Sequence, residues 1–218
     1  MPRPFDLVVF DWDGTVVDST AMIARSIQKA AADLQLSVPS LELASHVIGL
    51  GLNDALAAAV PDLPVGRIDE FSARYRYHYF AVEPDIVLFA GIRELLVTLA
   101  ESGARLAVAT GKSRRGLDRA FAATGLSMFF SASRCADETH PKPHPAMLHE
   151  LTEELGVAAT RTVMIGDTTH DLAMARAAGT AAIGVTYGAH PRAQLAAHDP
   201  LALAGSVDEL RPWLLIQR

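Results

Sequence analysis

Two carboxylates, Asp11 and Asp13, follow the apolar run at residues 7–10 and stand two residues apart. Such a run is typical of a buried parallel strand, and ligands in open α/β sheets bind just beyond the carboxyl ends of these strands. Side chains two residues apart on an extended backbone point to the same side, and Gly14 lets the chain turn away. Both carboxylates can therefore face one small volume, where a cation or a shared proton would relieve their repulsion. A solvated turn would also suit these residues, so the rest of the sequence must decide between a ligand site and a plain turn.

A second candidate segment begins at Thr110, directly after the apolar residues 106–109. Gly111 follows, and a helix is predicted over residues 114–124, so free backbone amides lie near a helix start. Helix starts bind anions through these amides and through the helix dipole. Thr110 and Gly111 are therefore candidates for anion binding, although a hydroxyl here could also serve only as a helix cap.

Lys142 lies in a third segment, in which every second residue from 141 to 145 is proline. These prolines exclude a helix and fix the backbone, so the lysine is expected on a stiff support. A lysine held in this way suits a phosphate or a carboxylate, and the alternative is an ordinary surface lysine in a turn. Metal binding by His140 and His144 is not expected, because no helix places them on one face.

Asp167 and Asp171 form the fourth segment, after the apolar residues 162–165. Asp171 stands near a predicted helix start, where the dipole favours a carboxylate, so one of the two acids could be a plain cap. Several acids with few other ligand types favour a hard cation such as Mg²⁺. Combined with a lysine and an anion-binding helix start, such a site points to phosphoryl transfer.

The elements that would position these residues alternate regularly beyond residue 92. Short apolar runs read as buried strands, and amphipathic stretches between them read as helices. This alternation predicts an α/β fold, with a doubly wound parallel sheet and helices on both faces. The predicted strands cover residues 106–109, 129–133, 162–165 and 181–185, and the predicted helices include residues 114–124, 147–155 and 172–178.

The region from residue 16 to residue 85 differs from the rest of the chain. It holds helical patterns at residues 22–34 and 53–59 and no convincing buried strand. We interpret it as a small α-helical cap domain inserted after the first strand, with hinges at its ends. The catalytic core would then comprise residues 1–15 and 86–218. Tyr75, Tyr77 and Tyr79 are expected in the core and interface of the cap.

The bulk composition excludes several classes of protein. The net charge is -6 and no cluster of Lys and Arg resembles a nucleic-acid patch, so any bound phosphate is expected to be small. Cys135 is the single cysteine, which excludes an internal disulfide and fits a reducing cytosol. We expect no signal peptide, no membrane span and a cytoplasmic location. The oligomeric state stays open between monomer and dimer.

In their order and context, the four segments resemble the four motifs of the haloacid dehalogenase-like superfamily. DWDGT at residues 11–15 resembles the first motif, and Thr110 stands at the place of the second. Lys142 stands at the place of the third motif, and GDTTHD at residues 166–171 resembles the fourth. The resemblance covers nearly the whole chain and implies a Rossmann-like core with a helical cap. Further similarity to phosphoglycolate phosphatase-like members rests on DWDGTVVDS, GLGLNDAL, VATGKS and VTYGAHP.

The resemblance also implies a role for each motif residue. Asp11 would be the nucleophile that becomes an aspartyl phosphate, and Asp13 would protonate the leaving oxygen and then activate water. The implied ligands of Mg²⁺ are Asp11, the backbone carbonyl of Asp13, and Asp167, with Asp171 in a supporting role. The residues implied to bind the phosphoryl oxygens are Thr110, Gly111, Gly14 and Lys142.

The expected activity is Mg²⁺-dependent hydrolysis of a small organic phosphate monoester, similar to phosphoglycolate. A sugar-phosphate mutase, similar to β-phosphoglucomutase, or a pyrophosphatase stays open as an alternative, and so does a catalytically idle phosphate-binding module. A mutase must hold a second phosphate in its cap. The cap arginines that leave this open are Arg25, Arg67, Arg74 and Arg76, and Asn53, Arg74 and His78 are candidates for contact with the leaving group.

Overall fold

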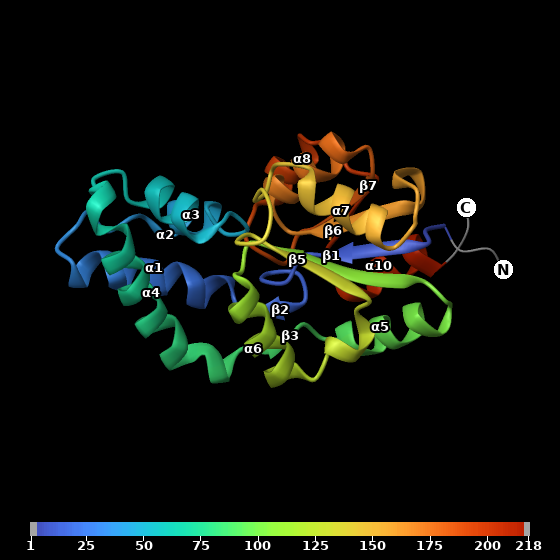
Figure 1. Cartoon of the computed structure of the whole chain (residues 1–218), viewed down its shortest axis with the longest axis horizontal. Coiled ribbons are helices and arrows are strands. Elements are labelled where there is room, and N and C mark those ends of the chain that lie inside the picture. The colour runs from blue at the N-terminus through green and yellow to red at the C-terminus, as the bar shows by residue number, and fades with distance from the viewer. Residues whose placement is uncertain (1–3, 216–218) are drawn as a thin grey trace.

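The strand β1 (Leu7–Phe10) lies inside a six-stranded parallel sheet in the computed structural model, which describes residues 4–215 (Figure 1). The strand order is β5-β4-β1-β6-β7-β8. The chain moves from β1 to β4 and β5 on one side and returns to β6, β7 and β8 on the other, so the predicted doubly wound fold is confirmed. The further strands are β4 (Arg105–Thr110), β5 (Ala132–Cys135), β6 (Thr162–Gly166), β7 (Ala181–Val185) and β8 (Ala202–Ala204).

Helices cover both faces of this sheet, as its continuous apolar strands require (Figure 1). On one face lie the helices α5 (Ile92–Glu101), α6 (Arg114–Thr124) and α10 (Val207–Leu215), whose leucines belong to one apolar cluster with side chains of β1 and β4. On the other face lie α7 (Ala146–Glu154) and α8 (Thr169–Ala178). The remaining helix of the core, α9 (Arg192–Ala196), follows β7.

Residues 20–82 form a separate helical part with its own apolar core (Figure 1). Its helices are α1 (Thr20–Asp33), α2 (Leu41–His46), α3 (Leu52–Ala59) and α4 (Ile68–Val82). Two short strands, β2 (Val17–Asp18) and β3 (Val87–Leu88), pair antiparallel where the chain enters and leaves this part. We call residues 20–82 the cap. Short 3₁₀ turns lie at residues 65–67, 83–85, 127–129 and 159–161.

Several local predictions differ from the structure. The strand predicted over residues 129–133 is β5, which begins at Ala132, because Phe129 ends a 3₁₀ turn. The region 16–85 contains the short strand β2, and Val16 and Val17 are buried with the core of the sheet. Tyr77 is 65% exposed, because a helix turns it away from the face that carries Tyr75 and Tyr79. Between residues 4 and 215, none of the helices has the length and apolarity that a bilayer span needs.

Candidate active site

Asp11 stands at the carboxyl edge of the sheet because of the strand register. Phe10 is paired with Val108 of β4 and Ile165 of β6, so the residues that follow these three lie at one edge. The backbone N–H of Asp11 still donates to the carbonyl of Ile165, at 2.9 Å. The Asp11 side chain is 1% exposed, and its Oδ2 atom has no hydrogen-bond partner among the described residues. A buried carboxylate oxygen without a donor is poised for a cation or for an electrophile.

Lys142 is fully buried between two acids. Its Nζ atom lies 2.8 Å from Oδ1 of Asp11 and 2.6 Å from Oδ1 of Asp171. Burial alone would lower the pKa of Lys142, but the two carboxylates hold it above its usual value, so the side chain is an ammonium. The alternative of an ordinary surface lysine is therefore wrong.

Asp167 and Asp171 are both held by hydrogen bonds at the start of α8. Thr15 Oγ1 donates to Oδ1 of Asp167 at 3.0 Å, and the N–H of Ala189 donates to its Oδ2 at 2.7 Å. Asp171 forms a capping box with Thr168, whose N–H and hydroxyl both donate to Oδ2. Asp171 is thus a helix cap and an ion-pair partner of Lys142 at the same time.

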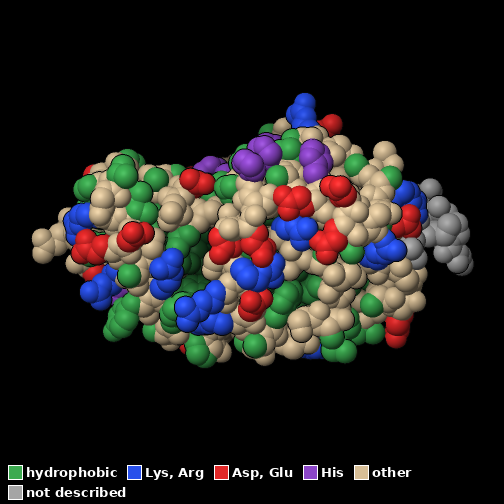
Figure 2. Space-filling view, in the orientation of Figure 1, with side chains coloured by type: hydrophobic (Ala, Val, Ile, Leu, Met, Phe, Trp, Pro, Cys, Tyr) green, Lys and Arg blue, Asp and Glu red, His purple; other side chains and the backbone are tan. Residues whose placement is uncertain are grey.

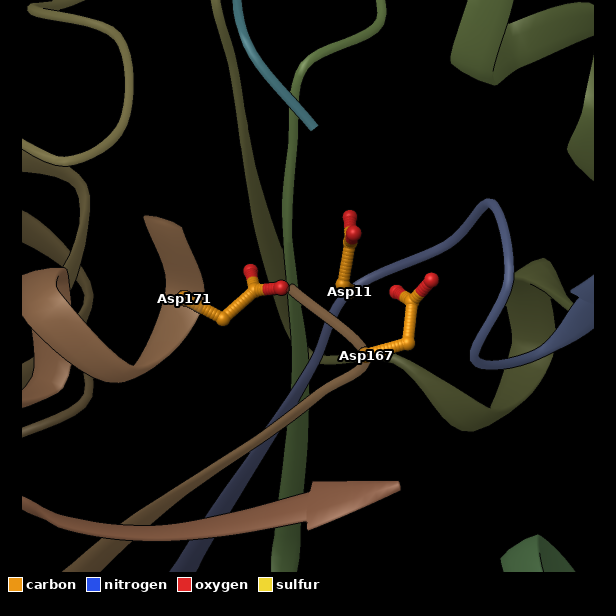
Figure 3. A group of neighbouring side chains, drawn as sticks. All are labelled: Asp11, Asp167 and Asp171. Atoms are coloured by element: carbon orange, nitrogen blue, oxygen red, sulfur yellow. The ribbon is translucent and has the colours of Figure 1, made fainter. Parts of the chain in front are cut away.

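Asp11, Asp167 and Asp171 form one buried cluster (Figure 3). One carboxylate oxygen of each lies within 4.8 Å of the others. Burial raises the pKa of Asp11 to about 7 against the attraction of Lys142, and the charge of Asp171 adds to the rise. Burial and the charges of Asp11 and Asp171 also raise the pKa of Asp167 well above its usual value. An oxygen-only cluster in which ionisation is this costly fits a hard divalent cation such as Mg²⁺.

Asp13 lies close to this cluster but its side chain is bound elsewhere. Ser19 Oγ donates to Oδ1 of Asp13 at 2.7 Å, and Lys112 Nζ lies 3.0 Å from Oδ2. The chain turns directly after Asp13, and this turn depends on Gly14, which has a φ of 77°. A Cβ on Gly14 would lie 2.1 Å from Asp167 Oδ2, so Gly14 makes room for that carboxylate. Its predicted contact with phosphate stays a prediction.

Thr110 and Gly111 lie at the carboxyl end of β4, beside the cap. The Thr110 hydroxyl accepts from the N–H of Lys112 at 3.2 Å, while Ser113 is the residue that caps α6. Gly111 touches the cap so closely that a Cβ there would lie 2.4 Å from the carbonyl oxygen of Leu50. The loop between α2 and α3 therefore lies over the carboxyl edge of the sheet.

The structure adds residues to the site that the sequence did not single out. Lys112 Nζ lies 3.0 Å from the hydroxyl of Tyr79 on α4, so this core lysine contacts the cap. His170 and His190 each contact the carbonyl oxygen of His46 through Nε2, at 3.1 and 2.9 Å. For Lys112, its position directly after Thr110 and Gly111 could have indicated a role in the site. No sequence signal was available for the two histidines, because their contacts are with His46, far away in the sequence.

Two of the three cap residues predicted to contact the leaving group are paired within the cap, and the predicted contact of Asn53 stays a prediction. His78 Nε2 is 2.7 Å from Oδ2 of Asp33, and Arg74 Nε is 3.5 Å from the same atom. Asn53 is exposed. Arg74 and His78 therefore link α4 to α1 within the cap. The rings of His140 and His144 stack on each other, with centroids 4.5 Å apart.

Comparisons with known proteins agree with this geometry. A family model described as haloacid dehalogenase-like hydrolase matches residues 8–185. A Dickeya dadantii protein named "Probable phosphatase IndB" is 39% identical over 210 residues, which span 94% of this chain and 91% of that protein. A phosphoglycolate phosphatase of Haemophilus influenzae is 32% identical over 199 residues, which span 86% and 88%.

Solved structures give the same result. The crystal structure of a predicted phosphoglycolate phosphatase from Haemophilus somnus superposes with a TM-score of 0.82 at 28% identity, over 93% of this chain and 94% of that one. The structure of a hydrolase from Pseudomonas syringae reaches a TM-score of 0.86, over 94% of this chain and 95% of that one. At 19% identity, this second likeness concerns the fold alone.

Proposed function

The chain belongs to the haloacid dehalogenase-like hydrolase family and is a phosphoric monoester hydrolase, and from this premise we propose that it hydrolyses a small organic phosphate with Mg²⁺ through an aspartyl phosphate. The observation that carries the proposal is the buried Asp11 carboxylate. One of its oxygens lacks a hydrogen-bond partner among the described residues, and Asp167 and Lys142 stand beside it. The phosphoglycolate phosphatases among the relatives support a substrate of similar size.

The first step is attack by an Asp11 carboxylate oxygen on the phosphorus atom of the substrate. The new O–P bond forms as the bond to the leaving oxygen breaks, and Asp13 gives that oxygen a proton. In the second step, Asp13 takes a proton from water, and this water releases inorganic phosphate from Asp11. Splitting one difficult displacement into two easier steps is the gain of covalent catalysis.

The charges around Asp11 suit this reaction. Lys142 supplies a buried ammonium, and the backbone at Gly111 supplies amides at the end of β4, so both can bind phosphoryl oxygens. Asp11, Asp167 and the backbone carbonyl of Asp13 would hold Mg²⁺, with Asp171 keeping Lys142 in place. A bound Mg²⁺ would supply positive charge against the transferring phosphoryl group.

Hydrolysis is favoured over the mutase reaction by the positions of the cap arginines. Arg67 forms a 2.7 Å ion pair with Glu70, and Arg74 lies against Asp33. Arg25 and Arg76 are exposed. None of these four arginines contacts a residue of the catalytic cluster, whereas a mutase needs cations in its cap for a second phosphate.

The test is hydrolysis of an aryl phosphate with Mg²⁺ and with excess EDTA, by the wild type and by Asp11→Asn. We expect turnover that requires Mg²⁺, and a loss of about 10³-fold or more in Asp11→Asn, because an amide is a poor nucleophile. Asp208→Asn, which changes an exposed aspartate on α10, is the matched control and should keep full activity. Metal-independent turnover, or full activity in Asp11→Asn, would contradict the proposal.

A further inference from the structure

The imidazole of His190 lies where the cap meets the core, and the proposed chemistry does not use it. The residue follows β7 and is only 2% exposed. Its Nε2 atom lies 2.9 Å from the carbonyl oxygen of His46, at the end of the cap helix α2. The two rings also stack, with their centroids 4.6 Å apart and an angle of 11° between their planes. His190 is therefore a direct contact between the core and the cap.

The hydrogen bonds of His190 fix its tautomer. Its Nδ1 atom accepts from the backbone N–H of Thr169 at 3.0 Å, so Nδ1 carries no proton. The proton of the neutral ring is then on Nε2, which donates it to the His46 carbonyl. Burial lowers the pKa of His190 to about 4, which agrees with a neutral ring. One ring nitrogen is thus bound to the core and the other to the cap.

The backbone around His190 holds Asp167, a proposed ligand of Mg²⁺. The N–H of His190 donates to the carbonyl oxygen of Asp167 at 3.2 Å, and the N–H of Ala189 donates to the Asp167 carboxylate at 2.7 Å. Gly188 lies so close that a Cβ there would be 2.3 Å from Asp167 Oδ2. Residues 188–190 therefore wrap around Asp167, and we call them the clamp. A movement of the clamp would move the hydrogen-bond partners of this carboxylate.

The cap is fastened to the core beside the clamp. His170 Nε2 lies 3.1 Å from the same His46 carbonyl that His190 binds, so two core histidines hold one cap oxygen. In Figure 2, the surface is hollowed where the cap meets the core, so the two parts are not packed together along their whole boundary on this side. The cap can swing about β2 and β3 only if the contacts at His46 break. The contact at His190 also reaches Asp167, through the clamp.

We propose that His190 is a positioning residue that couples the cap to the metal site, so that Mg²⁺ and the closed cap favour each other. The closed cap is the arrangement of this structure, in which the His46 carbonyl holds the His190 ring. When the cap swings away, the ring loses its hydrogen-bond partner and its stacked neighbour, so the clamp and Asp167 gain freedom. Coupling between two sites is reciprocal, so bound Mg²⁺ also holds the cap down. The inference rests on the proposed function, which supplies the Mg²⁺ site.

The first test measures the cap with and without saturating Mg²⁺. Hydrogen exchange followed by mass spectrometry reports on the backbone amides of residues 46–51. In the wild type, we expect Mg²⁺ to slow their exchange by about 10-fold, within the usual range for two coupled sites. In His190→Phe, which keeps an aromatic ring but loses both ring nitrogens, Mg²⁺ should leave this exchange unchanged. His149→Phe, at an exposed histidine of α7, is the matched control and should behave as the wild type.

Mg²⁺ binding provides the reciprocal readout and needs no turnover. Gly111→Ala moves the cap loop outward, because its Cβ would lie 2.4 Å from the carbonyl oxygen of Leu50. By titration calorimetry, we expect this change to weaken Mg²⁺ binding by about 10-fold in the wild-type background and to have no effect in the His190→Phe background. His190→Gln, whose amide N–H can donate to the same cap carbonyl, should restore part of the effect.

Two results would overturn the inference and leave the proposed function intact. One is exchange at residues 46–51 that Mg²⁺ does not change in the wild type, a measurement that needs no variant to fold. The other is an equal effect of Gly111→Ala on Mg²⁺ binding in both backgrounds, because His190 would then be only a packing residue. Absence of any Mg²⁺ binding by the wild type would instead be a failure of the proposed function.

Discussion

At the scale of single residues, the site depends on charges that are buried in pairs. Lys142 has no exposed side-chain surface, and both of its partners, Asp11 and Asp171, are buried acids. A buried ion pair contributes little net stability, but the removal of one partner leaves an uncompensated charge in a medium of low polarity. Lys142 is therefore the counter-charge of both acids when no cation is bound.

Lys142→Met tests this dependence. We expect the free energy of unfolding to fall by about 3 kcal/mol, because two buried carboxylates lose their counter-charge. Urea denaturation in excess EDTA at neutral pH measures this free energy of unfolding. Lys29→Met, at an exposed position, should stay within about 0.5 kcal/mol of the wild type. Equal stability of the two variants would mean that the fold does not depend on the buried charge of Lys142.

Three of the four motifs could be found from the sequence because each stands at the carboxyl end of an apolar strand. Asp11, Thr110 and Asp167 needed only the rule that ligands bind at the carboxyl ends of parallel strands. The burial of Lys142 could not be found in this way. Its turn is rich in proline, a residue type usually found at the surface, and only the packing of Asp171 beside it explains why the lysine lies inside.

At the scale of elements, the cap loop after α2 lies against Gly111, the residue that follows β4. The loop after α2 lies directly on Gly111, and the carbonyl of His46 at the end of α2 is held by His170 and His190 from the core. These contacts involve backbone atoms of the cap, which cannot move aside as a flexible side chain can.

Gly111→Ala is expected to hinder closure of the cap. The new Cβ would lie 2.4 Å from Leu50 O and 2.7 Å from Gly49 O, so the cap loop must move outward. We expect kcat/KM to fall by at least about 10-fold, because small displacements in an active site cost this much or more. The melting temperature should change little, since the open cap relieves the clash.

The control for Gly111→Ala is Gly66→Ala in the cap, where a Cβ would have no neighbour within 4 Å. It should match the wild type in activity and in melting temperature. Unchanged activity in Gly111→Ala would show that the contact with Leu50 is not part of the working enzyme.

Element boundaries were less predictable from the sequence than element types. The helix predicted from residue 172 begins at Thr169, because its first turn is polar and depends on the Thr168–Asp171 capping box. The edge strand β5 is only half-buried over Ala132–Arg134, so its side chains give a weak apolar signal. The neighbouring phenylalanines, which suggested an earlier strand, pack on the core from a 3₁₀ turn and from the residue after it.

At the scale of the whole molecule, two parts with separate apolar cores meet at one polar site. The sequence predicted both parts, because apolar periodicity is a local property of each segment. The contacts between the parts are long-range, and they join residues such as Lys112 and Tyr79 that are 33 positions apart. No local pattern encodes such a pair, so the cap residues of the site could not be predicted.

The buried acids make the stability of the metal-free protein depend on pH. Burial raises the pKa of Asp11 to about 7 from an unfolded value of 3.8, and it raises the pKa of Asp167 in the same direction. Between these values, the folded state binds more protons than the unfolded state. Stability contributed by these groups is therefore lost as the pH rises through the window from about 4 to about 7.

Mg²⁺ should reverse this loss, because it binds the ionised carboxylates. We expect excess Mg²⁺ to raise the melting temperature by several degrees at about pH 8, where protons no longer compete, and by much less at about pH 5. Scanning calorimetry with Mg²⁺ and with EDTA at both pH values measures this difference. Asp167→Asn should abolish most of the Mg²⁺ effect, whereas Asp208→Asn at the surface should leave it intact. An equal Mg²⁺ effect at both pH values would mean that the ion binds outside the Asp11, Asp167 and Asp171 cluster.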